Sequence, residues 1–263
     1  DNVDMPDIPE GHLDELPESA NRLRQMFGLD GNWTNDEIAR ARAAYYGLCT
    51  YLDDKIGHLM EVLGEQGLAE NTVIVHTSDH GDMLGEHGLW RKMCFYEQSA
   101  NVPLQISWPG KFEGGQRIGE AVSNVDAVAT ILDLAGIELD QYDLDGQSLA
   151  PALEGDTSTL NDVAISEHFA HGTDRALGMV RSGDWKLCYG HGDPVEIELY
   201  NLKSDPKEFI NLAGNPEHAE VQARLLQILL DQWGDPDEMT AKIIRDQEDR
   251  EIVRNVTGVG TIF

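Results

Sequence analysis

Apolar residues recur at helical spacing over a long stretch near the start of the chain. Thr34 is an N-cap candidate, and Asp36 and Glu37 follow in what would be the first turn. The apolar positions beyond them are separated by three, four or seven residues, the spacing of one helix face; they are Ile38, Tyr45, Leu48, Leu52, Ile56, Leu59 and Leu63. This pattern predicts a long amphipathic helix that ends near Gly64 or Gly67.

Two short apolar stretches predict strands. Residues 72–77 contain adjacent β-branched residues, which is typical of a strand covered on both faces, as in a parallel sheet. Residues 102–108 form the second stretch, and the turn signal Pro109-Gly110 follows it. An apolar helix is predicted over 126–135, stopped by Gly136. A helix followed by a buried strand is the unit of an α/β layer fold.

The pattern changes from about residue 160. Short alternating stretches at 178–181 and 185–189 predict a small antiparallel sheet. A helix is predicted at about 216–233, and the last thirty residues contain a charged helix. The predicted fold class is therefore α/β: part of a mixed, mainly parallel sheet sandwiched by helices, with a small C-terminal antiparallel sheet subdomain.

We expect three segments along the chain. Residues 1–33 show little periodicity and predict an irregular lead-in, residues 34–160 form the α/β part, and residues 161–263 form the small sheet with its helices. The chain has 263 residues, of which 41% are hydrophobic, so it can bury a substantial core.

The charge balance limits the classes of partner. The formal net charge is -29, from 48 acidic and 19 basic residues, and such a surface repels phosphate backbones and anionic headgroups. We therefore expect neither a nucleic-acid nor a membrane partner, and no apolar run approaches the ~20 residues that a transmembrane helix needs. A small anionic substrate would need a local cluster of positive charge.

Cysteine usage and the first residues bear on the compartment. Cys49, Cys94 and Cys188 are far apart and odd in number, which favours a reducing compartment over a disulfide framework. Cys49 lies inside the long predicted helix, where we expect it to pack in the core. No signal peptide is visible, but residues 1–9 are acidic and Pro-rich, as in a loop entered from an upstream segment. The localisation thus stays open between cytoplasmic and periplasmic.

Candidate chemistry is concentrated in residues 78–92, directly after the first predicted strand. Ligand crevices of α/β sheets form at this end of a strand. Asp79 and His80 can both reach one ion if the chain bends there, and Gly81 permits the bend. A carboxylate with an imidazole suits a divalent cation, although further ligands must come from elsewhere. Lys92 adds a compact positive charge able to hold an anionic oxygen.

Ordinary structural roles account for the same residues when each is taken alone. An Asp-His pair after a strand is common in turns, His87 could be a loop histidine bonded to backbone, and Lys92 could be a solvated surface lysine. Asp82 and Glu86 are best explained as surface charge. The whole constellation, more than any one residue, favours chemistry.

That constellation resembles the sulfatase family of the alkaline-phosphatase superfamily. The resemblance runs in order over about residues 36–215. The segments that carry it are Thr77–Gly81, Gly85–Trp90, Lys92-Met93, Tyr96-Glu97, Val102–Leu104, Pro109-Gly110, Ser123–Asp126, Leu132–Ile137, Gly146–Leu149, Glu198–Leu202, Asp205-Pro206 with Glu208, and Asn211–Ala213. It implies that residues 34–160 are the C-terminal half of the sulfatase α/β domain.

The resemblance implies roles for four residues. Asp79 and His80 would be ligands of one catalytic divalent metal ion, Ca²⁺ by default, with Mn²⁺ and Mg²⁺ as alternatives. Lys92 would contact sulfate or phosphate oxygens and stabilise negative charge that develops there. His87 would either touch the substrate or shape the loop.

The implied activity is metal-dependent hydrolysis of sulfate esters. His80, directly after the metal-binding Asp, resembles the branch that contains choline sulfatases and phosphonate monoester hydrolases. Glu167, His168 and His171 either line the substrate pocket, as that region does in relatives, or belong to a solvated loop. Two alternatives stay open: a phosphodiesterase or phosphonate monoester hydrolase on the same fold, and a non-catalytic binding subunit.

The family's nucleophile motif is not found in this sequence. Family members carry paired metal-binding acids and then Cys or Ser followed by x-Pro-x-Arg. None of the three cysteines of this chain is followed by x-Pro-x-Arg. We therefore name no nucleophile. We expect this chain to supply one half of the active site, to need a missing N-terminal half as its partner, and to be inactive without it. The resemblance leaves homo-oligomer formation open.

Overall fold

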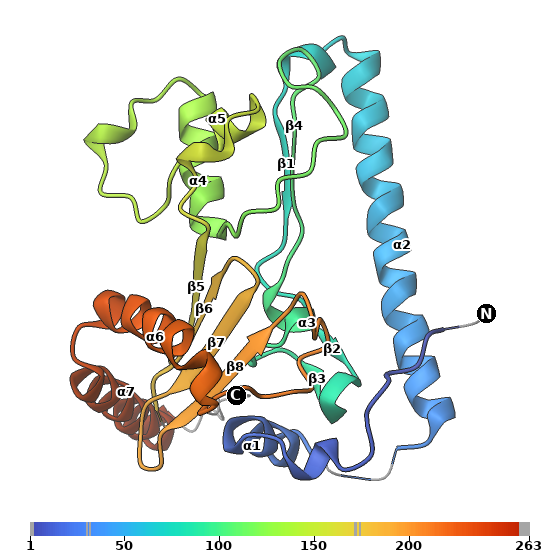
Figure 1. Cartoon of the computed structure of the whole chain (residues 1–263). Coiled ribbons are helices and arrows are strands. Elements are labelled where there is room, and N and C mark those ends of the chain that lie inside the picture. The colour runs from blue at the N-terminus through green and yellow to red at the C-terminus, as the bar shows by residue number, and fades with distance from the viewer. Residues whose placement is uncertain (1–2, 30, 32, 171–172, 174, 258–263) are drawn as a thin grey trace.

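The computed structural model describes residues 3–29, 31, 33–170, 173 and 175–257 (Figure 1). Its α-helices are α1 (Glu18–Met26), α2 (Asn35–Glu65), α3 (Glu97–Ala100), α4 (Asn124–Leu134), α5 (Ala150–Leu153), α6 (Ala219–Trp233) and α7 (Pro236–Thr257). Its strands are β1 (Ile74–Thr77), β2 (Met83–Leu84), β3 (Trp90–Arg91), β4 (Leu104–Ser107), β5 (Val163–His168), β6 (Leu177–Ser182), β7 (Trp185–Gly190) and β8 (Glu196–Asn201). The predicted α/β class is confirmed.

Helix α2 confirms the long helix predicted from periodicity, but its apolar residues lie on the surface. A capping box begins it: the Thr34 hydroxyl accepts from the Glu37 N–H at 3.3 Å, and the Glu37 carboxylate accepts from the Thr34 N–H at 2.9 Å. The apolar stripe that predicted the helix is largely exposed, with Leu48 67%, Leu52 54% and Leu59 57% exposed. Cys49 is exposed too, so the prediction that it packs in a core is wrong for this chain by itself.

Strands β1 and β4 form a two-stranded antiparallel pair. Ile74 lies opposite Ser107 and Thr77 opposite Leu104. We predicted a mainly parallel sheet here, yet every strand pair among the described residues is antiparallel. The reason is that an apolar β-branched run indicates two covered faces and does not fix the direction of the neighbouring strand.

The small C-terminal antiparallel sheet is confirmed, in the strand order β5-β6-β7-β8. Helix α6 covers one face (Figure 1), and its Leu225, Leu229 and Trp233 are buried against the sheet. The approach is so close that a Cβ on Gly178 would lie 2.5 Å from the Trp233 ring. Burial of these side chains stabilises this part of the chain as a core of its own.

The lead-in segment is not irregular throughout, since it contains α1. Only Ala20 and Leu23 of this nine-residue helix are buried, too few apolar repeats for a periodic pattern to reveal. They join a second core cluster with Met83, Tyr96 and Tyr200. Because this cluster draws on all three predicted segments, the proposed boundaries at 33/34 and 160/161 stay a prediction.

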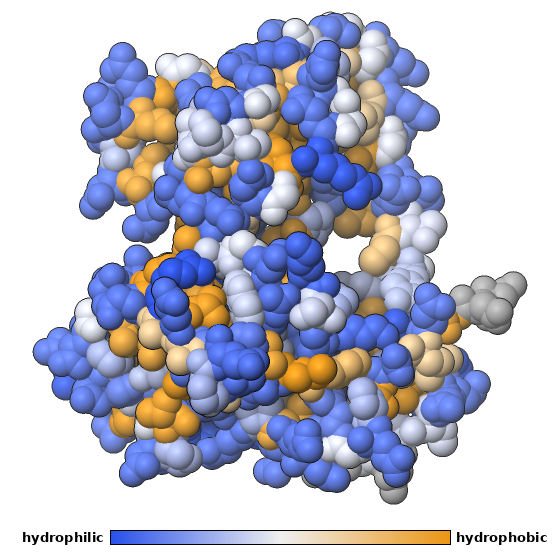
Figure 2. Space-filling view, in the orientation of Figure 1, coloured by the Kyte–Doolittle hydropathy of each residue, from blue (hydrophilic) through white to orange (hydrophobic). Residues whose placement is uncertain are grey.

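Apolar residues reach the surface in the part of the molecule built from α2, the β1–β4 pair and α4. In Figure 2 hydrophobic side chains emerge there between polar ones. On α4 the exposed residues are Val125, Val128 and Ile131. No helix among the described residues is both long and apolar enough to cross a membrane.

Candidate active site

The loop that follows β1 is fixed on two sides. On one side the Gly81 N–H donates to the Ser99 carbonyl of α3 at 2.8 Å. On the other, the side-chain amide of Asn124, the first residue of α4, donates to the Ser78 carbonyl at 2.8 Å. Within the loop the Ser78 hydroxyl donates to the His80 carbonyl at 2.8 Å. Asn124 therefore holds this loop as well as beginning α4.

The structure brings Asp79, His80 and Lys92 together. His80 Nε2 lies 3.5 Å from Asp79 Oδ2 and 2.8 Å from Lys92 Nζ. His80 Nδ1 lies 2.8 Å from the Gly81 carbonyl, which can only accept, so Nδ1 carries the proton and Nε2 presents its lone pair. A backbone carbonyl that fixes the tautomer in this way is the usual outer-shell partner of a metal-binding histidine.

Asp79 is held as a carboxylate. The His80 backbone N–H donates to Asp79 Oδ1 at 3.0 Å, and this bond, together with the positive charge of Lys92, lowers the pKa of Asp79 below its ordinary value. Its side chain is 85% exposed. An exposed carboxylate beside an unprotonated imidazole nitrogen is chemically suited to hold a divalent cation. Among the described residues no third His, Cys, Asp or Glu side chain completes a metal site with them.

A cavity of about 400 Å³ opens beside these three residues. Ser99 and Ala100 of α3 line it, and Glu167 and His168 of β5 reach it from the C-terminal sheet. Glu167 is fixed there, since its Oε1 accepts from the Trp233 indole at 2.6 Å. The third residue considered with them in the sequence, His171, lies outside the described residues. The cavity thus joins the metal-site candidates to the small sheet.

Lys92 is placed by an unusual backbone. The residues on either side of it, Arg91 and Met93, both have positive φ angles, 72° and 79°. Non-glycine residues rarely adopt this region, and such strain is found preferentially at functional sites. The Arg91 guanidinium in turn stacks over the Phe27 ring at 4.8 Å. The loop therefore directs Lys92 toward His80 at a cost in backbone energy.

His87 lies away from the cavity, in a buried aromatic cluster. It is 1% exposed, stacks on Tyr96 with ring centroids 3.7 Å apart, and its Nδ1 lies 2.8 Å from Nε2 of His12. Burial, and then the neighbouring His12, lowers the pKa of His87 to about 4. Of the two roles open to His87, this position favours shaping the loop over touching the substrate.

We expect His87 to make stability depend on pH. Its folded pKa of about 4 lies below the ordinary 6.5, so its contribution is fully present above pH 6.5 and is lost as the pH falls toward 4. The contribution is at most about 3 kcal/mol. Asparagine tolerates the φ of 52° at this position. Denaturant unfolding at pH 7.5 and 4.5 should therefore show a smaller loss for His87→Asn than for the wild type; equal losses would contradict the assignment.

Glu86 is not the surface charge that we predicted. Its Oε1 lies 2.6 Å from the guanidinium of Arg42, which is buried, and its Oε2 accepts from the Leu84 N–H at 2.7 Å. Arg42 comes from α2, 44 residues earlier in the chain, so no local pattern announced this pair. The ion pair attaches the β2–β3 loop, and with it Lys92, to the long helix.

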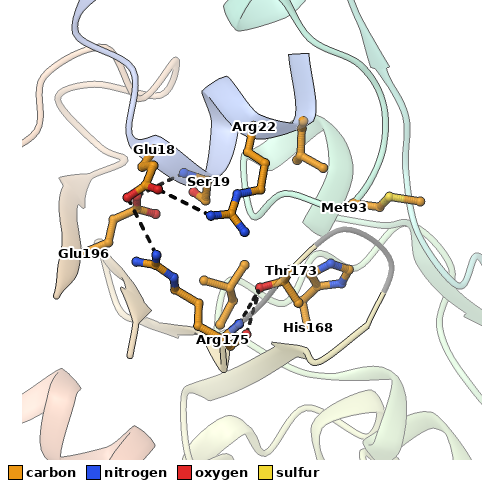
Figure 3. Close-up of a pocket in the computed structure, with 10 residues that line it drawn as sticks. Glu18, Ser19, Arg22, Met93, His168, Thr173, Arg175 and Glu196 are labelled. Carbon is orange, nitrogen blue, oxygen red and sulfur yellow. Dashed lines mark hydrogen bonds and ion pairs between the residues drawn. The ribbon is translucent and has the colours of Figure 1, made fainter. Parts of the chain in front are cut away.

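A second pocket, shown in Figure 3, borders the cavity. Met93 and His168 line both the pocket and the cavity. In it Glu18 of α1 pairs with Arg22 at 3.4 Å and with Arg175 at 3.7 Å. The Ser19 N–H donates to Glu196 Oε2 at 3.1 Å. These contacts fasten α1 to the C-terminal sheet beside the candidate site.

Comparison with known families matches two models to this chain. The model described as "N-sulphoglucosamine sulphohydrolase, C-terminal" covers residues 85–235. The model described as "Sulfatase" covers residues 11–137. Together they include every element that forms the candidate site.

Individual relatives agree with these models. The chain is 41% identical over 223 residues to a choline-sulfatase of Rhizobium meliloti, and this match covers 84% of this chain and 42% of the relative. A solved structure in complex with its substrate D-glucosamine-2-N,6-O-disulfate is similar with a TM-score of 0.69 and 30% identity, over 86% of this chain and 50% of that chain. A phosphonate monoester hydrolase from Silicibacter pomeroyi is similar with a TM-score of 0.69 and 28% identity, over 84% and 50%. The chain thus spans less than half the length of that curated relative and half of each solved chain.

Proposed function

Because the chain belongs to the sulfatase family of the alkaline-phosphatase superfamily, we propose that it supplies part of the active site of a metal-dependent sulfate ester hydrolase. The observation that carries the proposal is the convergence of Asp79, His80 and Lys92 beside a cavity of about 400 Å³. Sulfate ester hydrolysis needs a cation and an anion clamp at one point, and these side chains are suited to both tasks.

Asp79 and His80 are the residues that would hold the metal ion. The donor set fits by type, because an ionised carboxylate and an unprotonated imidazole Nε2 lie side by side. The Lys92 ammonium, itself a cation, already lies 2.8 Å from that nitrogen. Ca²⁺ is our first proposal, with Mn²⁺ and Mg²⁺ as alternatives. When bound, the ion supplies Lewis-acid polarisation of a substrate oxygen.

Lys92 is proposed as the anion clamp. Its ammonium group reaches the cavity from a strained loop, and a compact positive charge there offsets the unfavourable field of a chain with a net charge of -29. It would bind sulfate oxygens and stabilise negative charge as the ester bond breaks. His87 supports the loop from its buried position on Tyr96.

The nucleophile and the remaining metal ligands are proposed to come from an N-terminal half. Two observations support this: the relatives are about twice as long as this chain, and apolar residues of α2 and α4 are exposed on the same part of the molecule. Exposed apolar side chains, such as Leu48 and Leu52 of α2 and Val128 and Ile131 of α4, suit burial against further secondary structure. We propose that the chain is inactive without that half.

The substrate is proposed to be a small sulfate ester. The 41% identity to a choline-sulfatase supports a sulfuric ester of a small alcohol. A second candidate, phosphonate monoester or phosphodiester hydrolysis, is favoured by the likeness to the phosphonate monoester hydrolase. Both substrate classes present tetrahedral anionic oxygens to a metal ion and a lysine. The acidic surface disfavours nucleic acid and membranes as partners.

The test is hydrolysis by the full-length protein that contains this chain. We expect metal-dependent release of sulfate from a small sulfate ester, lost on chelation and restored by Ca²⁺ or Mn²⁺. Lys92→Met should lower kcat/KM by about 10²-fold, because it removes one charged contact to the reacting group. Lys203→Met, at a surface lysine with a side chain 77% exposed, is the matched control and should leave kcat/KM unchanged.

Two results would count against the proposal. Hydrolysis that survives both chelation and Lys92→Met would remove the metal and the clamp from the mechanism. A phosphonate monoester hydrolysed far faster than any sulfate ester would favour the second candidate instead.

A further inference from the structure

A buried lysine and two glutamates lie between the C-terminal sheet and the candidate active site. Lys186 of β7 is 0% exposed, and its Nζ lies 2.7 Å from Glu208 Oε1 and 2.9 Å from Glu97 Oε1. Glu208 is 1% exposed and belongs to the segment after β8. Burial opposes the ammonium form, but the charge of Glu208, with smaller help from Glu97, raises the pKa of Lys186 above its ordinary value. The cluster is therefore an ion pair, shared by two carboxylates.

This cluster holds the N-terminus of α3. Glu97 is the first residue of that helix, and its backbone N–H donates to Glu208 Oε2 at 2.7 Å. A four-residue helix has little stability of its own, so such outside contacts decide its position. Because the contacts come from β7 and from the segment after β8, the sheet determines where α3 lies.

Helix α3 in turn supports both parts of the candidate site. In the loop after β1 that carries Asp79 and His80, here called the metal-site loop, the Gly81 N–H donates to the Ser99 carbonyl. The two segments are so close that a Cβ on Gly81 would lie 2.1 Å from the Gln98 carbonyl oxygen. Ser99 and Ala100 line the cavity next to Lys92. Only four residues separate Lys92 from Glu97 along the chain. A shift of α3 would thus change the spacing between the metal-site loop and the anion clamp.

An apolar side chain would fill the Lys186 position at less cost if packing were its only task. Charges removed from water lose solvation, and a well-packed apolar substitute is often at least as stable as a buried ion pair. Glu208 also keeps an uncommon φ of 57° while it makes these contacts. Such features point to a requirement for one defined geometry, which directional polar contacts provide.

We infer that Lys186, Glu97 and Glu208 form a positioning cluster that holds α3 and so sets the distance between the Asp79–His80 loop and Lys92. The catalytic consequence rests on the proposed function, whereas the structural coupling does not. Disruption of the cluster displaces the Gly81 contact first, because Gly81 is where the loop touches α3.

The test compares Lys186→Met with Leu187→Ala in the full-length protein. Leu187, the next residue of β7, is also 0% exposed, but it belongs to the core that the sheet forms with α6. Its truncation should therefore weaken the sheet without removing a contact to α3. Amide hydrogen exchange at Gly81 should speed up about tenfold or more in Lys186→Met, beyond any change that Leu187→Ala causes there. kcat/KM should fall at least about tenfold in Lys186→Met, and the change should lie in kcat more than in KM. Lys186→Arg should recover part of the lost kcat/KM.

A milder variant keeps the inference testable if Lys186→Met does not fold. Glu97→Gln removes one charge from a side chain that is 24% exposed and should raise Gly81 exchange in the same direction. Gly81 exchange that matches the Leu187→Ala control in both Lys186→Met and Glu97→Gln would overturn the inference. If the wild-type protein hydrolyses no sulfate ester, the proposed function fails, and the exchange measurement still decides whether the cluster positions the loop.

Discussion

Replacing Asp79 by asparagine is expected to lower kcat/KM of the full-length protein for a sulfate ester by at least about 10³-fold. Asparagine keeps the size of the side chain but removes the negative charge that a divalent cation requires. The variant should also bind the metal ion more weakly, so a metal titration by calorimetry should give an affinity below that of the wild type. The low pKa of Asp79, which follows from the bond donated by the His80 backbone N–H and from the charge of Lys92, implies that the wild-type group is ionised across the neutral range.

The matched control for that variant is Asp82→Asn. Asp82 lies three residues further along the same segment but does not line the cavity that Asp79, His80 and Lys92 share. The Asp82→Asn protein should retain metal affinity and most of the activity, apart from the small effect of removing a half-buried charge that interacts with Tyr45. If Asp82→Asn lost metal binding and Asp79→Asn kept it, Asp82 and not Asp79 would be the metal ligand, and our assignment would be wrong.

Local patterns predicted elements well and their partners poorly. The stripe from Ile38 to Leu63 predicted α2, and alternation predicted β6 and β7, because each pattern follows from the geometry of one element. The direction of β4 beside β1 is a property of two distant segments, so the apolar run at 72–77 could not reveal it. Helix α1 was missed because it buries only two apolar side chains and gains its place from contacts with later segments.

The same distinction applies to the candidate site. Asp79, His80 and Lys92 lie within fourteen residues of one another after a predicted strand, and the structure brings them together. His87 lies in the same segment but faces His12 and Tyr96, 75 residues before it and nine after it. Whether a loop residue points into a cavity or into the core depends on what packs behind the loop.

Lys186 was the least predictable of the functional candidates. A charged residue between Trp185 and Leu187 in an alternating strand ordinarily indicates the solvent-facing side. It is buried because Glu97 and Glu208, 89 residues before it and 22 after it, meet it on that face. The only sequence signal that singled out Glu97 and Glu208 was their place in family-like motifs, which gave no reason to link them to the lysine.

Gly81→Ala is expected to disrupt the candidate site through the backbone alone. The added Cβ would lie 2.1 Å from the Gln98 carbonyl oxygen and 3.1 Å from its carbon, and neither atom belongs to a flexible side chain. The loop or α3 must therefore move, and the Gly81 N–H bond to the Ser99 carbonyl would lengthen or break. We expect a loss of about 1–3 kcal/mol in the free energy of unfolding. We also expect a fall of about 10²-fold in kcat/KM, since misplacement by about 1 Å has that effect.

Gly119→Ala separates this clash from the general effect of adding a methyl group. Among the described residues, no atom beyond the chain neighbours of Gly119 lies within 4 Å of a Cβ placed there, so the free energy of unfolding of Gly119→Ala should differ from wild type by no more than about 0.5 kcal/mol. Denaturant unfolding and sulfate ester kinetics of both variants, in the full-length protein, give the comparison. A Gly81→Ala protein with wild-type kcat/KM would show that the contact between the metal-site loop and α3 tolerates displacement. Asp79, His80 and Lys92 would then act without the fixed spacing that we attribute to α3.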